Sequence, residues 1–213
     1  MKLKIMLAVV AMFASITNAS HAARGTDGNV SIVYWQAPSI LNPYLSSGTK
    51  DIESASLVIE PLGRYTETGA LVPFLAKEIP TVANGGVSPD LTSITWTLQE
   101  GLLWSDGTPV TSADVKFSAD YCMHPEGGCS QLAKFDGIKS ISIPDDLTVV
   151  VTFEGPMPNP YGPFMGGQTP IIQKAQFENC LGPKAQQCTE QNFNPIGTGP
   201  FVVTEFRPND VIQ

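Results

Sequence analysis

Four cysteines are the residues whose spacing points most directly to chemistry, because they come as two close pairs. Cys122 lies near Cys129, and Cys180 lies near Cys188. An even number of cysteines in an exported chain favours disulfides, and of the three possible pairings we expect 122–129 and 180–188, each closing a short loop. A tetrathiolate zinc site is the alternative, but its paired ligands usually have two to four residues between them. The spacing therefore predicts structural disulfides, with no bound metal.

Acid–base or nucleophilic catalysis has few candidates in this sequence. His124 is the only histidine after residue 22, and it falls inside the predicted 122–129 loop. The sequence has no G-x-S-x-G, H-E-x-x-H, G-x-x-x-x-G-K-[ST] or G-x-G-x-x-G motif. Glycoside hydrolysis needs two facing carboxylates, whereas Asp145 and Asp146 lie at a predicted hairpin tip. We therefore expect a binding protein without a cofactor; a secreted hydrolase whose catalytic residues lie beyond this chain is the alternative.

The N-terminus has the three parts of a secretory signal. Lys2 and Lys4 precede an apolar run over residues 5–16, and small residues lead to Ala22. This run is too short to span a bilayer, and no cysteine stands beside the cleavage site to carry a lipid. We expect residues 1–22 to be a cleaved signal peptide and the mature protein to reach the periplasm. A buried N-terminal helix is the alternative, but no capping residue opens it.

The overall charge excludes some partners. The chain has 20 acidic and 12 basic residues and a net charge of −8, and it becomes more acidic when the two signal lysines are removed. Nucleic acids and anionic membrane surfaces repel such a protein. After the signal no apolar run approaches the roughly 20 residues of a spanning helix. Gly and Pro are numerous and spread along the chain, which indicates a turn-rich fold with many strands.

The hydrophobic pattern mixes strands and helices without a repeat. The clearest strand covers residues 93–99, where alternating apolar side chains would share one buried face. Thr111 and Asp114 form a capping-box pattern that predicts a helix ending near residue 121. This mixture is typical of an α/β or α+β fold. The other predicted elements are strands over 30–35, 138–143, 147–153 and 201–206, a helix over 51–60, and a strand beginning at 211.

Residues 94–115, ITWTLQEGLLWSDGTPVTSADV, resemble the signature of the dipeptide/oligopeptide-binding proteins of ABC importers. The likeness covers essentially the whole chain after residue 22. It departs from the family at Asn42, where Asp is usual, and at Gln99, where a basic pair begins. Four further segments match in the same order, LNPY at 41–44, LVPFLA at 71–76, DDLTVVVTF at 145–153 and GTGPF at 197–201.

The resemblance implies an α/β fold of the periplasmic-binding-protein type II-like kind, with two lobes that close on a ligand. In the cluster C form of this fold, lobe I would comprise residues 23–59 and 173–213, and residues 60–172 would form the extra subdomain. The chain stops just after a strand begins, so we expect a truncated chain whose second lobe is missing. Residues 23–213 alone would then bind ligand weakly.

By the same resemblance, the protein would act as a monomer that captures dipeptides or oligopeptides and delivers them to a membrane-embedded ABC permease. The family holds peptide backbone by strand-like hydrogen bonds. A glycine in such a segment would let the ligand approach closely, although an ordinary polar turn would look the same. The positions that match the family's ligand-binding segment are Ser46, Ser47, Gly48 and Thr49, with Gln131 facing the cleft.

The substrate stays open at this stage. Relatives with this resemblance also bind nickel complexes, oligosaccharides, opines or haem, and an interaction or chaperone-like protein on the same scaffold is a further alternative. The loop aromatic residue Tyr161, with Phe164 and Met165, could line the cleft or fill the core, and we favour the core.

Overall fold

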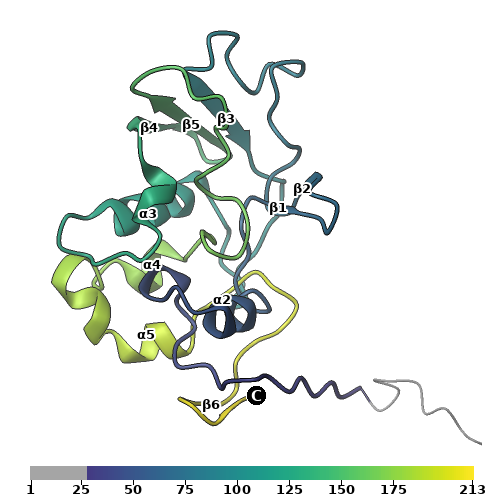
Figure 1. The fold of residues 1–213 in the computed structure, drawn as a ribbon, viewed down its shortest axis with the longest axis vertical. Helices are drawn as coiled ribbons and strands as arrows, with labels where there is room; N and C mark the ends of the chain where they lie inside the picture. Colours follow the sequence, from purple (N-terminus) through teal and green to yellow (C-terminus); the bar gives the residue numbers. More distant parts are fainter. Residues whose placement is uncertain (1–27) are drawn as a thin grey trace, which may run out of the picture. The chain divides into compact units, whose positions relative to one another are not determined.

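The computed structural model describes residues 28–213 (Figure 1). The chain forms a short N-terminal unit that ends at Trp35 and a second unit from Gln36 to Gln213. The predicted signal peptide, residues 1–22, lies outside the described residues. Within residues 28–213, no helix is both long and apolar enough to cross a membrane.

The strand predicted over residues 30–35 is wrong for this structure. Residues 28–35 have no strand assignment, and the side chains of Val30, Val33 and Trp35 are 71%, 94% and 76% exposed. β-branched and aromatic residues suit a pleated surface, but a strand also requires a hydrogen-bonded neighbour. The sequence pattern shows that the residue types suit a strand, but it does not show whether a neighbouring strand is present.

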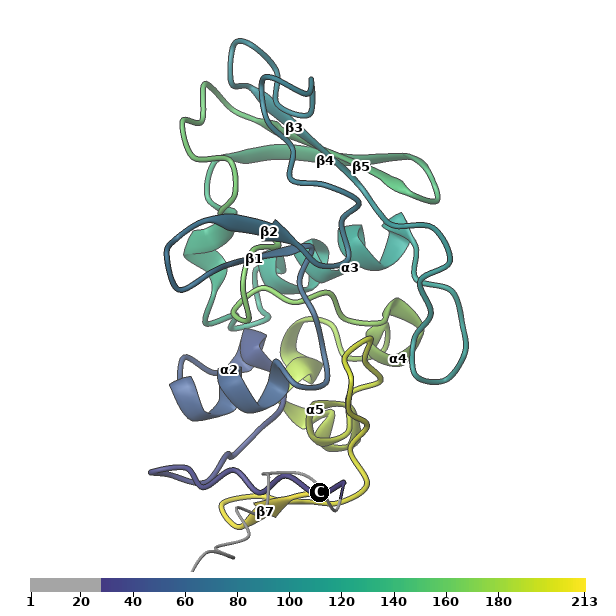
Figure 2. The same ribbon diagram turned by 90° about the vertical axis from the view of Figure 1, so that its right-hand side faces the viewer.

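A three-stranded antiparallel sheet forms one end of the second unit (Figures 1 and 2). Strands β3 (Ser93–Thr97) and β4 (Ile138–Asp145) flank β5 (Thr148–Phe153). Ile94 pairs with Val151 and Trp96 with Val149, and all four side chains are completely buried. The predicted strand over 93–99 is therefore confirmed as far as Thr97, and the predicted hairpin is confirmed, because alternation places one face of β3 and of β5 in the core.

Two short hairpins complete the strands of the described residues. β1 (Gly63–Tyr65) pairs with β2 (Leu71–Pro73), and β6 (Phe206–Arg207) pairs with β7 (Val211–Ile212). The prediction of a strand over 201–206 is wrong except at its last residue, whereas the start of a partner strand at 211 is confirmed. Asn209 has a φ of 62° in the turn between them, and beyond the two paired residues the N–H of Gln213 donates to Glu205 O at 2.9 Å.

Helix α3 (Ser112–Met123) lies between the sheet and the remaining helices. Its predicted capping box is present, with the Thr111 N–H donating to Asp114 Oδ2 at 2.9 Å. Asp114 Oδ1 also accepts the backbone N–H of Lys174, at 2.9 Å. Because Lys174 begins α4 (Lys174–Phe177), one buried carboxylate caps the starts of both helices.

Helix α2 (Thr49–Ala55) begins before and ends sooner than the predicted 51–60. The carbonyl of Val58 accepts the N–H of Gly199 at 2.8 Å instead of continuing the helix. Pro61 also disfavours helical geometry for the residue before it. The chain after α2 therefore runs along the C-terminal segment, which the sequence pattern does not show.

Segments from both ends of the second unit pack together. The N–H of Leu41 donates to Asn192 O at 2.9 Å, and the N–H of Gly199 donates to Val58 O at 2.8 Å. Figures 1 and 2 show α2 beside α5 (Thr189–Phe193), on the side of α3 away from the sheet. This arrangement agrees with a lobe built from both segments, while the boundaries at residues 59 and 172 stay predictions. The helical elements of the described residues also include three 3-10 helices, η1 (Pro43–Leu45), η2 (Leu132–Phe135) and η3 (Gly182–Gln187).

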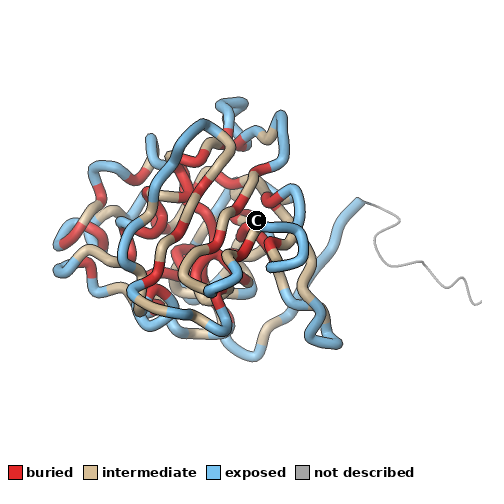
Figure 3. The backbone as a smooth tube through the Cα atoms, turned by 90° about the horizontal axis from the view of Figure 1, so that it is seen from above, coloured by how far each residue is buried: buried red, intermediate tan, exposed pale blue. Residues whose placement is uncertain are grey.

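One hydrophobic core runs through the second unit, and Figure 3 shows the buried positions inside a shell of exposed ones. Phe164 is completely buried and Met165 is 6% exposed, so the prediction that they fill the core is confirmed. Tyr161 is half-buried and contacts the ring of Trp96 edge-on, and its hydroxyl donates to Pro80 O at 2.6 Å. These aromatic residues join the sheet to the loops around it.

Candidate functional site

Residues 46–49, here called the 46–49 segment, connect η1 to α2 and include Thr49, the first residue of α2. The backbone of Ser46 is extended, with φ −141° and ψ 144°, and that of Gly48 is extended at φ −73° and ψ 125°. Ser47 and Thr49 are exposed. No hydrogen bond joins the backbone N–H or C=O of Ser47 to another residue of the described chain. Ser47 therefore offers an unpaired N–H and C=O that an extended ligand could use.

The conformation before this segment is set by Asn42, which the structure buries almost completely. Its Oδ1 accepts the N–H of Tyr44 at 3.1 Å and so caps η1. Its Nδ2 donates to the hydroxyl of Tyr121 at 3.1 Å and to Asn192 Oδ1 at 2.8 Å. Burial raises the pKa of Tyr121 to about 12, so this hydroxyl stays neutral. One amide thus joins three parts of the chain behind the candidate site.

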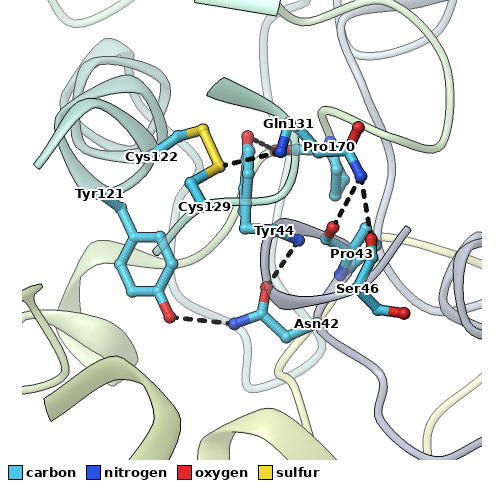
Figure 4. Close-up of a disulfide and its surroundings, with 9 residues drawn as sticks. All are labelled: Asn42, Pro43, Tyr44, Ser46, Tyr121, Cys122, Cys129, Gln131 and Pro170. Carbon is cyan, nitrogen blue, oxygen red and sulfur yellow. Dashed lines mark hydrogen bonds between the residues drawn. A yellow bond between two sulfur atoms is a disulfide. The ribbon is translucent and has the colours of Figure 1, made fainter. Parts of the chain in front are cut away.

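Gln131 lies directly against the 46–49 segment and is only 5% exposed. Its Nε2 donates to Ser46 O at 2.9 Å and to Pro43 O at 3.2 Å (Figure 4). The structure therefore brings Gln131 together with the segment, as the sequence predicts. However, its N–H donors are engaged with backbone carbonyls of the protein, and direct ligand contact by Gln131 stays a prediction.

Asp51, which the sequence analysis did not identify, supports the segment from the other side. Its buried carboxylate accepts the Ser46 hydroxyl at 2.7 Å and the Ser39 N–H at 2.7 Å. Burial alone would raise the pKa of Asp51, but the hydrogen bonds from Lys50, Ser39 and Ser46 and the charge of Lys50 outweigh it, so the pKa lies below its usual value of 3.8. Ser39 is distant in sequence, so no local motif marks this contact.

Lys50 completes the polar cluster around Asp51. Its Nζ lies 2.9 Å from Asp51 Oδ1 and donates to the Ser39 hydroxyl at 2.7 Å, and its side chain is 10% exposed. A buried ion pair is retained at little cost only when hydrogen bonds satisfy its remaining groups. Here the extra bonds go to Ser39 and Ser46, so the pair fixes the backbone on both sides of it.

Both predicted disulfides are present, which confirms the pairing. The Cα atoms of Cys122 and Cys129 are 5.0 Å apart, and those of Cys180 and Cys188 are 5.9 Å apart. His124, inside the first loop, is half-buried rather than solvated, and its Nδ1 accepts the N–H of Glu126 at 3.2 Å. Within residues 28–213, no group of three or more His, Cys, Asp or Glu side chains could hold a metal ion.

An open depression of about 370 Å³ lies elsewhere, beside the turn at residues 105–109 and the start of α4. Gln173 Nε2 donates there to Asp106 Oδ2 at 2.9 Å and to Thr108 Oγ1 at 3.0 Å. Three of its polar side chains thus bond to one another, and the 46–49 segment does not line it. We therefore regard the 46–49 segment as the candidate site.

Comparison with known proteins supports the fold and gives the family. Residues 70–213 match "Bacterial extracellular solute-binding proteins, family 5 Middle". Protein XP55 of Streptomyces lividans is 32% identical over 183 residues, which are 84% of this chain and 31% of that protein. The dipeptide-binding protein DppE of Bacillus subtilis is 24% identical over 198 residues, covering 82% of this chain and 33% of that protein.

A solved structure gives the same result at the level of the fold. The binding protein AgaA of A. tumefaciens R10, in complex with agropinic acid, is 28% identical with a TM-score of 0.66, and the match covers 80% of this chain and 32% of that one. The periplasmic-binding-protein type II-like α/β fold is thus confirmed, and the chain spans about a third of the length of these relatives. The chain belongs to the bacterial extracellular solute-binding proteins of family 5.

Proposed function

We propose that the protein is the substrate-binding component of an ABC importer, that it captures dipeptides or oligopeptides, and that it passes them to a permease in the membrane. The observation that carries this proposal is Ser47 in the 46–49 segment, which is exposed between two extended residues and whose backbone N–H and C=O bond to no other residue of the described chain. A peptide can add to such a segment by backbone hydrogen bonds whatever its side chains are. The similarity to a dipeptide-binding protein supports this substrate class.

Delivery by binding alone, without turnover, is part of the same proposal. The family consists of binding proteins, and the charge of −8 does not favour nucleic acid as a partner. We infer that the protein acts as a monomer in the periplasm after removal of residues 1–22. The family's extracellular character supports this location.

A non-peptide solute is the second candidate, and one observation favours it. AgaA is 28% identical to this chain, and its solved structure holds agropinic acid. A small polar acid would depend on hydroxyl side chains, and Ser47 and Thr49 are exposed at the segment. Such a ligand would be recognised through side chains rather than through the main chain.

A thermal-shift screen tests the substrate class. The 213-residue chain, and any longer product of the same gene, is mixed with dipeptides to pentapeptides, agropinic acid, oligosaccharides and nickel ions. A ligand that binds only the folded state raises the melting temperature. We expect a shift with peptides that is small for the 213-residue chain and larger for a longer product. No shift of that longer product with any of these compounds would contradict capture of a small solute.

Two substitutions at Ser47 separate main-chain from side-chain recognition. Ser47→Pro removes the free N–H, and the extended backbone of Ser46 is compatible with a following proline. Ser47→Ala keeps the N–H and removes only the hydroxyl. We expect the proline variant to lose about tenfold in peptide affinity, as for one lost hydrogen bond, and the alanine variant to bind normally. Equal losses in both variants would favour the non-peptide solute.

A further inference from the structure

The Cys122–Cys129 disulfide lies at the C-terminal end of α3, near the candidate site (Figure 4). Cys122 is in the last turn of α3, directly after Tyr121, whose hydroxyl accepts Asn42 Nδ2 at 3.1 Å. Cys129 directly precedes Ser130, whose N–H donates to Tyr44 O at 2.7 Å. Each cysteine is thus next to a residue that is hydrogen-bonded to residues 42–45, the turn that leads into the 46–49 segment (Figure 4).

Gln131 contacts both the disulfide and the 46–49 segment. Its backbone N–H points to Cys129 Sγ at 3.4 Å, and its side chain is buried. A single amide nitrogen, Nε2, donates to Pro43 O and Ser46 O, which are the carbonyls on either side of the turn. Spanning these two carbonyls fixes the direction in which the chain leaves η1 and enters its extended course at Ser46.

We propose that Gln131 is a positioning residue, held by the Cys122–Cys129 disulfide, that sets the conformation of the 46–49 segment rather than binding the ligand itself. The bridge closes a loop with a sequence separation of 7, so it limits the motion of Ser130 and Gln131 relative to α3. Without it, the segment loses the fixed donor that orders it. The ligand part of this proposal rests on the proposed function, but the ordering of the segment does not.

The second disulfide provides a comparison within the same chain. Cys180–Cys188 closes a loop of similar size, with a sequence separation of 8. The N–H of Asn192 donates to Cys188 O at 2.9 Å, and Asn192 contacts Asn42. This second loop contacts the first through Gly182 and His124, but its hydrogen bonds to the turn go through Asn42 and not through Gln131. Its removal therefore tests a route to the turn that does not use the Gln131 donor.

Two variants of Gln131 test the positioning directly. Gln131→Glu places a carboxylate against two carbonyl oxygens at neutral pH, whereas its protonated form regains one O–H donor. Gln131→Met keeps the size and has no donor at any pH. The measurement is the pair of amide ¹H–¹⁵N NMR resonances of Ser47 and Gly48 in the 213-residue chain, followed from pH 7 to about pH 3.5, a range that brackets an ordinary glutamate pKa.

We expect both variants to shift these resonances at neutral pH, and only the glutamate variant to return toward the wild-type positions on acidification. Asp51 and Lys50 also bond to this part of the chain, and Gln131→Met reports their own pH response because it leaves them in place. Unchanged resonances in Gln131→Met would overturn the positioning role. A shift in the glutamate variant that does not respond to pH would also overturn it, because the lost donor would then not be the cause.

A double-mutant cycle tests the link to the disulfide. Trialanine binding is measured by calorimetry for Gln131→Met, for Cys122→Ser with Cys129→Ser, and for the combination. Each change is expected to weaken binding about tenfold, and the combination no further, because both act through the same donor. Cys180→Ser with Cys188→Ser should instead add its effect to that of Gln131→Met. Additive losses with the first bridge would contradict the link.

A failure of the proposed function can be distinguished from a failure of the positioning role of Gln131. If trialanine does not bind the wild-type protein, the NMR comparison still decides whether Gln131 orders the segment. If the cysteine variants do not fold, the two Gln131 variants still test the positioning role, because they leave both bridges intact.

Discussion

The imidazole of His124 lies against the backbone of Gly182, and this contact joins the two loops that the disulfides close. A Cβ built on Gly182 would stand 2.6 Å from His124 Cε1, and Gly182 also has a φ of +60°. The glycine is therefore required for two independent reasons, space and backbone conformation.

Gly182→Ala should lower the free energy of unfolding by about 2 to 4 kcal/mol, since left-handed strain and overpacking add. Gly101→Ala is the matched control, because Gly101 has a φ of +74° and open space around it. The control should lose only about 1 kcal/mol from strain. Urea unfolding of both variants measures the difference, and equal losses would show that the His124 contact does not restrict this position.

Asp51→Asn should destabilise the protein by about 2 to 4 kcal/mol, because it leaves the buried Lys50 ammonium without its counter-charge. The surface pair Lys116–Asp120 serves as control, and Asp120→Asn should change stability by less than about 1 kcal/mol. Denaturant unfolding at pH 7 compares the two. Similar small losses would mean that the buried pair contributes no more than the exposed one.

The same carboxylate predicts a pH dependence. The pKa of Asp51 is lowered on folding, so its contribution to stability is present above the ordinary value of 3.8 and is lost as the pH falls through the lower folded value. The wild-type protein should therefore lose stability in this acidic range, and Asp51→Asn should lack that part of the loss. Thermal unfolding between pH 7 and about pH 2.5 measures it. Parallel curves for the two proteins would contradict the assignment.

Asn42→Asp introduces the residue that is usual in the family, and yet it should destabilise this protein. The new carboxylate would face Asn192 Oδ1, which now accepts a hydrogen bond, and Asn192 Nδ2 is already bonded to Ala185 O at 2.8 Å. We expect a loss of about 2 kcal/mol, as for a buried group without its partner. Adding Asn192→Asp should worsen the loss, because it places a second carboxylate beside the first.

The elements with a strong local signal could be predicted from the sequence. Ile94, Trp96 and Leu98 alternate cleanly and are all buried, and the capping box at Thr111 begins α3 as expected. Both disulfides also follow from the spacing of the cysteines. Each of these features is set by residues close together in the sequence, so the sequence pattern alone is enough to predict it.

Features that depend on distant partners could not be predicted in the same way. Alternation over residues 30–35 suggested a strand that the structure does not form, and α2 ends early because Val58 bonds to Gly199. In the site, family resemblance found Ser46 and Gln131, but the bond from Ser39 to Asp51 crosses 12 residues without a motif. Polar networks of this kind become visible only when the chain is folded.

The shared carboxylate of Asp114 has a mechanical consequence. Its two oxygens accept the N–H groups of Thr111 and Lys174, and the N–H of Ile172 donates to Ser118 on the same helix at 2.9 Å. Hydrogen bonds therefore join α3 to the chain on both sides of residue 172, the predicted boundary between the extra subdomain and lobe I. In the closure on a ligand that the proposed function implies, the two parts should turn as one rigid body, so the bending must take place at other points of the chain.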